Sequence, residues 1–410
     1  MPSLWGKRNF LLYFLAETIS TFGSSMLFIG INWYVRESSG TNTAVGAVLS
    51  LSIASSFLLF PLAGTVADRF PRRSTLLVMC LCRAAIYLLF LVAALFGRLG
   101  TPGIYLLVVL NGMGWAFHTP VSRGFLQEIL ERGELVHGNS WVEMSLQAGA
   151  FLSAGFTGIV LKLLGISAVL SIAAGTYLLA VLLLAGIRYT PLAVPDSGEP
   201  FFAQFSRGLR YLGARPRLLW LGLLMQVPFV VVIVSNVVLP GYVEDVLGAG
   251  AVAFGLADMS YGLAAFCSSL LLSLFASRLS RFPLLMALFG LVLAALGGLY
   301  LNRLAALAYL GMFLFGLGNT PLKILLTSTL MEIVDKEQFG RAMALWTGLS
   351  SLLQVGLSFA LGAALDRVSE NHGYLALAVV MAGGLAGLAV LLPRLRRGSA
   401  RSPSEAPPPI

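Results

Sequence analysis

Charged side chains are scarce in this chain of 410 residues: Asp, Glu, Lys and Arg together make up 11% of it. A soluble domain carries roughly a quarter charged residues. Apolar residues make up 58% of the chain, and a soluble protein of this length could not bury so much apolar surface. The shortage of charge therefore excludes a soluble globular protein and indicates a chain that folds in lipid.

Cysteine and histidine are also rare, with three residues of each. The cysteines lie inside apolar runs, so we predict packing residues rather than disulfide partners. Cys80-Leu81-Cys82 lacks the spacing of a zinc or redox pair, and the histidines are too far apart in the sequence to suggest a metal site. We therefore expect no metal and no cofactor.

Motifs of nucleotide-driven and hydrolytic proteins are missing as well. The chain has no Gly-x-x-x-x-Gly-Lys-Ser/Thr phosphate loop and no Gly-x-Ser-x-Gly nucleophile elbow. The net charge of +9 comes from short breaks between apolar runs and not from a basic stripe interleaved with aromatic residues, so we expect no nucleic-acid partner. These absences argue against an enzyme and leave a membrane enzyme or scramblase as a remote alternative.

Apolar runs long enough to cross a bilayer follow one another along the chain. A spanning helix needs about 20 residues, and the runs predict an all-α membrane protein with twelve such helices. The first run has no cleavage site after a short core, so we expect a retained helix and not a signal peptide. The expected helices are residues 9–35, 43–67, 74–96, 102–125, 139–164, 167–187, 218–243, 251–277, 282–301, 304–326, 339–365 and 373–392.

Five segments follow from this pattern. We expect a cytoplasmic N-terminus at residues 1–8, an N-terminal six-helix bundle at 9–187 and a cytoplasmic linker at 188–217. A C-terminal six-helix bundle at 218–392 and a disordered cytoplasmic tail at 393–410 complete the chain. The linker is polar and rich in proline, and the tail ends in a proline run, which is typical of segments without a packed core.

The positive charges predict the orientation of these helices. Most Lys and Arg residues fall in the breaks on the same side as the N-terminus. The opposite side holds only Arg36, Arg98, Lys162, Arg303 and Arg367. Because basic loops stay in the cytoplasm, we expect a multi-pass protein of the cell (plasma or inner) membrane with both termini on the cytoplasmic side.

The two halves carry similar residues at matching places. Gly112-Met113-Gly114 precedes Thr119-Pro120 in the fourth predicted helix, and Gly316-Leu317-Gly318 precedes Thr320-Pro321 in the tenth. Two six-helix halves related by an axis along the membrane normal are suited to alternating access around a site between them. The pattern therefore favours a secondary transporter.

The break between the second and third predicted helices reads Gly64-Thr65-Val66-Ala67-Asp68-Arg69-Phe70-Pro71-Arg72-Arg73. It resembles the loop 2–3 signature of the major facilitator superfamily, roughly G-x-x-x-D-R-x-x-R-[RK], and the resemblance extends over the whole chain. It implies a two-bundle fold in which the loop latches the halves on the cytoplasmic side. The implied latch residues are Gly64, Asp68, Arg69, Arg72 and Arg73.

Shorter motifs are similar to the drug-exporter branch that includes macrolide efflux proteins. They are Thr119-Pro120, the segment 135–140 and the segment 338–342. Two departures from the exporter motifs mean that the proton relay of that branch does not transfer in full to this chain. Asn111 and His118 stand in the helix where many such exporters have an Arg, and the segment 154–158 lacks the Gly-Pro of the exporter motif.

Polar residues inside apolar runs are candidates for transport, because a charge at mid-bilayer costs roughly 2.5–3.5 kcal/mol or more and faces a cavity or a partner. As proton-coupling residues we predict Glu17, Asp258, Glu143 and His118, and as counter-ions Arg83 and Lys323. Each of these has a structural alternative, such as an ion pair, a solvated helix end or a snorkelling side chain. Polar residues expected in a cavity are Asn32, Gln147, Gln226, Asn236, Asn319 and Gln354.

Pairs of small residues four apart allow helices to approach closely. Ala154 with Gly158 and Gly356 with Ala360 are such pairs, and we expect them to let the two halves move against each other. The resulting hypothesis is a monomeric, proton-coupled exporter of amphipathic drugs or metabolites that works among membrane lipids. A carrier of lysophospholipids, other lipids or other small metabolites is the alternative.

Overall fold

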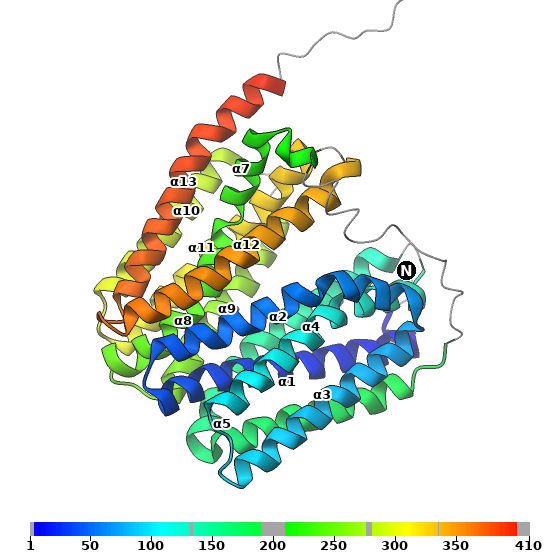
Figure 1. Cartoon of the computed structure of the whole chain (residues 1–410). Helices are drawn as coiled ribbons and strands as arrows, with labels where there is room; N and C mark the ends of the chain where they lie inside the picture. The colour runs from blue at the N-terminus through cyan, green and yellow to red at the C-terminus, as the bar shows by residue number, and fades with distance from the viewer. Residues whose placement is uncertain (1–3, 132–133, 190–209, 276–280, 335, 400–410) are drawn as a thin grey trace, which may run out of the picture.

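The computed structural model describes the chain except for residues 1–3, 132–133, 190–209, 276–280, 335 and 400–410. Every regular element in the part of the chain that it describes is a helix, as the composition predicts (Figure 1). Eleven helices in this part are long and apolar enough to cross a membrane, and one of them, at 49 residues, has the length of two spans.

The first half begins with a short 3₁₀ turn, η1 (Leu4–Gly6), and continues through five long helices. A left-handed glycine, Gly40 (φ 67°), ends the first of them, and the side chain of Thr41 caps the second by accepting the N–H of Ala44. Such caps satisfy backbone groups that a helix end leaves unpaired. The helices are α1 (Arg8–Ser39), α2 (Asn42–Arg69), α3 (Arg72–Leu95), α4 (Thr101–Ile129) and α5 (Leu135–Ala185).

Helix α5 contains a break at Gly165, whose backbone is non-helical (φ 73°, ψ −174°). A positive φ is cheap only for glycine, so the chain turns here and α5 consists of two spanning segments. The break lies where the sequence predicts the connection between the fifth and sixth helices.

The described residues of the second half form eight helical elements. Helix α13 runs to Ser399, past the predicted end at residue 392, because its Leu and Arg residues favour a helix beyond the apolar span. Of the predicted linker and tail, residues 190–209 and 400–410 lie outside the described residues. The elements are α7 (Pro216–Met225), α8 (Val227–Gly241), the π-helical turn η3 (Tyr242–Val246), α9 (Ala251–Phe275), α10 (Arg281–Leu301), α11 (Ala305–Ile333), α12 (Lys336–Leu365) and α13 (His372–Ser399).

The seventh predicted helix is interrupted between α7 and α8. Pro228 has no N–H to donate to the preceding turn, and the helix re-forms with the Phe229 N–H donating to the Gln226 carbonyl at 3.0 Å. On α11, the Asn319 side chain donates to the Pro228 carbonyl at 3.3 Å. The interruption therefore ties α8 to α11.

Each half has its own buried apolar core. One core is built from residues 4–187 alone. The other is built from residues 212–388, together with Ile29, Trp33 and Ala154 of the first half. The repeated glycines pack in matching ways: a Cβ on Gly112 of α4 would lie 2.6 Å from the Ser52 carbonyl oxygen of α2, and a Cβ on Gly316 of α11 would lie 2.3 Å from the Tyr261 carbonyl oxygen of α9.

The two halves meet at one end of the molecule and diverge toward the other (Figure 1). We call the first the Arg36 end, because it holds Arg36 and the α1–α2 and α12–α13 connections. The second, where the described chain begins and ends, is called the terminal end. Helix α2 packs on α12 and α5 packs on α9 across the division.

Glycines bring the halves together near the Arg36 end. A Cβ on Gly158 of α5 would lie 2.5 Å from the Ala251 carbonyl oxygen of α9, as the sequence pattern predicts. On α12 the prediction of Gly356 and Ala360 is wrong, because Gly356 has no atom within 4 Å that a Cβ would meet and Ala360 is exposed. Gly362 makes the contact instead, because a Cβ there would lie 2.5 Å from the Asn42 carbonyl oxygen of α2.

Candidate transport cavity and its gates

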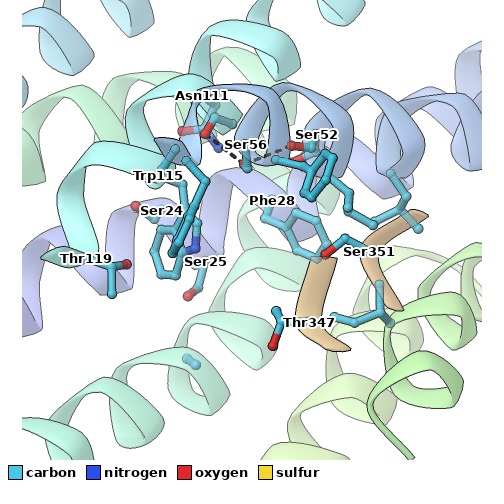
Figure 2. Close-up of a pocket in the computed structure, with 18 of the residues that line it drawn as sticks. Ser24, Ser25, Phe28, Ser52, Ser56, Asn111, Trp115, Thr119, Thr347 and Ser351 are labelled. Carbon is cyan, nitrogen blue, oxygen red and sulfur yellow. Dashed lines mark hydrogen bonds between the residues drawn. The ribbon is translucent and has the colours of Figure 1, made fainter. Parts of the chain in front are cut away.

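A cavity of about 1200 Å³ lies between the two halves. Figure 2 shows residues of α1, α2 and α4 on one side of it and Thr347 and Ser351 of α12 facing them. Such a volume is at or above the upper end of the range for small-molecule sites. Its position between two pseudo-symmetric halves is where a transporter of this architecture binds its substrate.

Aromatic rings and small hydroxyls dominate the cavity wall. Phe28, Phe57 and Trp115 supply large apolar faces, and serines lie among them. The Ser56 hydroxyl bonds within the wall, 2.8 Å from the Gly112 carbonyl oxygen and 2.9 Å from that of Ser52 (Figure 2). Apolar faces with a few polar groups fit molecules that are themselves amphipathic.

Two charged side chains of the second half, Asp258 of α9 and Lys323 of α11, line this cavity. The Lys323 ammonium lies 5.1 Å from the centre of the Phe229 ring, a cation–π contact. Among the described residues neither side chain has an ion-pair partner within 4.0 Å. The cavity therefore presents one carboxyl group and one ammonium group that a substrate can contact.

Glu17 and His118 form a pair behind the cavity wall. His118 Nε2 of α4 lies 3.4 Å from Glu17 Oε1 of α1, and the Glu17 side chain is only 5% exposed. The His118 ring stacks on Trp115, which lines the cavity. One turn away, the Tyr13 hydroxyl lies 2.7 Å from that of Ser122. Two predicted residues that are far apart in the sequence are thus in contact and one ring away from the cavity.

Arg83 of α3 is buried deeper in the first half. Its guanidinium donates to the Tyr177 hydroxyl, to Ser24 Oγ at 3.2 Å and to the Asn111 carbonyl at 3.3 Å. Ser24 and Asn111 line the cavity. In the described part of the chain it has no carboxylate partner, so hydroxyls and a carbonyl hold this cation beneath the cavity wall.

Glu143 lies elsewhere. Its carboxylate is 2.6 Å from the Arg123 guanidinium, and its side chain is 54% exposed. It does not belong to the cavity lining that the structure describes. The pair joins α4 to α5 near the terminal end, and the coupling role of Glu143 stays a prediction.

The six predicted cavity amides have different surroundings. Gln147 lines the cavity. Asn236 donates to carbonyls of its own helix, Gln354 donates to Ser350, and Asn319 donates to Pro228 and to the Tyr261 hydroxyl. Asn32 and Gln226 are buried away from the described lining. Polar residues on one helix can face either a cavity or a neighbouring helix, and the sequence does not distinguish the two.

Arg72 and Arg73 of the predicted latch bind within the first half. The Arg72 guanidinium lies 3.3 Å from the Glu128 carboxylate and donates to the Gly124 carbonyl at 2.8 Å. Arg73 donates to the last carbonyls of α5. They tie α3 to α4 and α5. The structure does not describe the side chains of Asp68 and Arg69 or the surroundings of Gly64, so the latch stays a prediction.

A cluster of charges joins the halves at the Arg36 end, and the sequence did not reveal it. The buried Arg36 of α1 lies 2.9 Å from Glu244, contacts Asp245, and lies 3.6 Å from Glu370, which precedes α13. We call these four residues the Arg36 cluster. Burial and the hydrogen bond with Asp245 raise the pKa of Glu370 above its ordinary value, although Arg36 opposes this.

Asp366 makes a second link between the halves at this end. It follows α12, and its carboxylate accepts the N–H of Asn42 at 2.5 Å, the N–H of Thr43 at 3.1 Å and the Thr43 hydroxyl. It therefore caps α2 of the other half. Burial would raise the pKa of Asp366, but these hydrogen bonds outweigh it and hold the pKa below its ordinary value. Acidic residues at the ends of the predicted helices could have indicated these links between the halves, but the orientation rule counts only basic residues.

Comparison with known proteins identifies relatives over nearly the whole chain. The model of the family described as Major Facilitator Superfamily matches residues 13–356. Macrolide efflux protein A of Streptococcus pyogenes is 22% identical over 383 residues, which cover 90% of this chain and 92% of that protein.

Solved structures share the fold. The nucleoside transporter NupG matches with a TM-score of 0.75 at 12% identity, over 93% of this chain and 99% of that one. A bacterial homologue of the human lysosomal transporter Spinster, described as inward-facing and unoccupied, matches with a TM-score of 0.69 at 13% identity, over 95% and 96%. A D-xylose–proton symporter matches with a TM-score of 0.67 at 16% identity, over 93% and 96%.

Proposed function

Because this chain belongs to the major facilitator superfamily, whose members carry small molecules across membranes, we propose that it exports amphipathic molecules in exchange for protons. The observation that carries the proposal is one large cavity between two halves that, in the residues the structure describes, meet at the Arg36 end. Closure there and opening at the other end is one of the two states that alternating access requires.

The cavity wall supports an amphipathic substrate. It combines aromatic faces with hydroxyls and two charged side chains, Asp258 and Lys323. Sugars and nucleosides need many directional hydrogen bonds, whereas this wall is mainly apolar. The macrolide efflux protein among its relatives also favours a bulky, largely apolar cargo over a small polar one.

The charges of the loops support a cytoplasmic location for both termini in the cell membrane. The Arg36 end then faces the outside and is closed, and the terminal end faces the cytoplasm. In this arrangement the cavity collects substrate from the inner side. Export follows when the Arg36 cluster separates and the latch of residues 64–73 forms.

The Glu17–His118 pair is the proposed proton site. A buried carboxylate needs a partner or a proton, and an imidazole can hold or release a proton near neutral pH. When His118 is protonated the two form an ion pair, and when one proton leaves the pair the local charge changes by one. Because Trp115 lines the cavity and its ring stacks on that of His118, a substrate bound at that ring can bias the pair's protonation.

The experiment is a panel of substrates offered to the purified protein in vesicles. The protein acts as a monomer among membrane lipids in this proposal, so no partner chain is needed. We expect movement of the dye Hoechst 33342 and of a macrolide, driven by an imposed pH gradient, and no movement of xylose or a nucleoside. Movement of lysophosphatidylcholine alone would favour the lipid carrier, and gradient-independent movement of lipids would indicate a scramblase.

A further inference from the structure

A second hollow, of about 490 Å³, lies on the outer surface of the first half. It is lined by α1 and α5 together with one residue of α9, and its wall is almost entirely apolar. We call it the lateral groove and define it by Phe14, Phe22, Met144, Ala148, Leu152 and Phe266.

The lateral groove faces the hydrocarbon of the membrane. Trp141, Met144 and Leu152 line it and are 40%, 39% and 51% exposed. In a spanning segment such apolar exposure is covered by lipid chains. Trp141 packs edge-on against Trp5 with ring centres 5.1 Å apart, and paired Trp side chains are typical of the membrane–water interface.

The length of the groove fits one leaflet. From Trp141 to Leu152 the helix rises about 16 Å at 1.5 Å per residue. This is about half of a hydrocarbon core roughly 30 Å thick. The groove therefore runs from the interface at the terminal end to about the middle of the membrane.

The groove is closed toward the Arg36 end. There Phe22 contacts Phe156 with ring centres 5.9 Å apart, and α5 and α9 then pack tightly through Gly158 and Gly255. A molecule in the groove cannot pass farther along it and can leave only sideways or back into the leaflet.

One turn of α5 separates the groove from the central cavity. Gln147 and Ala150 line the cavity, whereas Ala148 and Gly149 line the groove. At the edge of this wall, Phe151 of the cavity meets Phe266 of the groove, with ring centres 5.9 Å apart. These two aromatic rings therefore lie at the boundary between the two hollows.

We propose that the lateral groove is a side entrance: it takes the apolar tail of an amphipathic molecule from the leaflet at the terminal end and passes it between Phe151 and Phe266 into the cavity. The proposal rests on the proposed function, since it supplies the substrate of the same cavity. A tail that entered through water would cost about 0.8 kcal/mol for each exposed CH₂ group. A path from hydrocarbon to an apolar cavity avoids that cost.

The groove holds a tail through its shape, because lipid chains are as apolar as its wall and burial brings no hydrophobic gain. Occupancy is therefore measured with palmitic acid carrying a photoreactive diazirine, in vesicles containing the wild-type protein. We expect crosslinks concentrated on residues 141–152. Crosslinks spread evenly over the lipid-facing helices, or a crosslinked pair of chains covering the groove, would overturn the proposal.

Passage is tested by filling the groove with Ala148→Phe and comparing it with Leu163→Phe, a control on the lipid-facing side of α5 where Leu163 is 70% exposed. Ala148→Phe should reduce crosslinking and Hoechst 33342 transport several-fold, while dye binding to the protein in detergent stays unchanged. The control should behave as wild type. Transport by Ala148→Phe at the wild-type rate would refute the entrance.

A second variant tests the passage independently, in case Ala148→Phe misfolds. Phe266→Ala widens the passage and should speed entry of the dye, and an unchanged rate would count against the gate. If the wild-type protein moves no amphipathic dye although its groove is labelled, the proposed export function fails and the groove as a lipid-chain site stands.

Discussion

Replacing Arg36 by Ala should open the Arg36 end. The guanidinium is 5% exposed, and the side chains of Glu244, Asp245 and Glu370 are 34%, 42% and 14% exposed. A fully buried pair loses about 3–5 kcal/mol when one partner is removed, whereas an exposed pair contributes about 0–1 kcal/mol. For this partly buried cluster we expect a loss of about 2 kcal/mol. At 1.4 kcal/mol for each factor of ten, the closed population falls about 30-fold relative to the open one.

The assay is a distance measurement between spin labels on Ser38→Cys and Val368→Cys, on opposite halves at this end, in a background without the native cysteines. Wild type should give mainly the short distance, and Arg36→Ala should add a longer one. Arg36→Lys should lie between them, because an ammonium cannot reach two carboxylates with the planar fork of Arg.

Arg98→Ala is the matched control, since it removes a positive charge from an exposed position at the same end. The structure gives Arg98 no ion pair in the residues it describes. It should leave the distances unchanged. An equal shift in both variants, or no shift in Arg36→Ala, would refute the assignment of the cluster as a lock.

Three further predictions concern the same cavity and its closure. The pKa of Glu370 is raised in the closed state, so the closed state binds the proton of Glu370 more tightly than the open state does. Closure should therefore weaken as the pH rises through that raised pKa. A stronger closed signal in the spin-label distances at higher pH would contradict this linkage. Gly362→Ala places a Cβ 2.5 Å from a carbonyl oxygen of α2 and should destabilise the closed state by about 1–3 kcal/mol. Gly356→Ala, with open space around the added Cβ, should have no effect. Equal spin-label distances in the two variants would exclude the contact. Asp258→Asn should weaken binding of a cationic dye several-fold and leave binding of a neutral analogue unchanged, as measured by fluorescence titration. Lys323→Ala should weaken binding of an anionic dye in the same assay.

The positions of the spanning segments were predictable, because they depend on patterns within one segment, whereas the ends of α13 and the interruption between α7 and α8 were not. The apolar runs located the spanning segments, and the break at Gly165 lies between the fifth and sixth of them. Gly112 and Gly316 correspond in the sequence repeat, and the structure shows that each packs against a neighbouring helix of its own half. Local pattern and helix period carry this information.

Apart from the close approach at Gly158, the contacts between segments were not predictable. Glu17 and His118 were each candidates, but only the packing of α1 on α4 brings them within 3.4 Å. Arg36 was counted as a loop charge, yet it is buried against acids more than 200 residues away. Glu143 was chosen for its position in an apolar run, but the face it occupies points to Arg123. Which side of a helix meets a cavity depends on the tertiary arrangement, and a single sequence does not encode that in a local pattern.

The most direct test of proton-coupled export is dye transport from vesicles under an imposed pH gradient, with wild type and Glu17→Gln side by side. The amide keeps the shape of the side chain and its contact with His118 but cannot take up or release a proton. We expect the gradient to accelerate transport by the wild type and to have no effect on Glu17→Gln, although the variant still binds the dye. Equal acceleration in both proteins would contradict the assignment of this pair as the proton site.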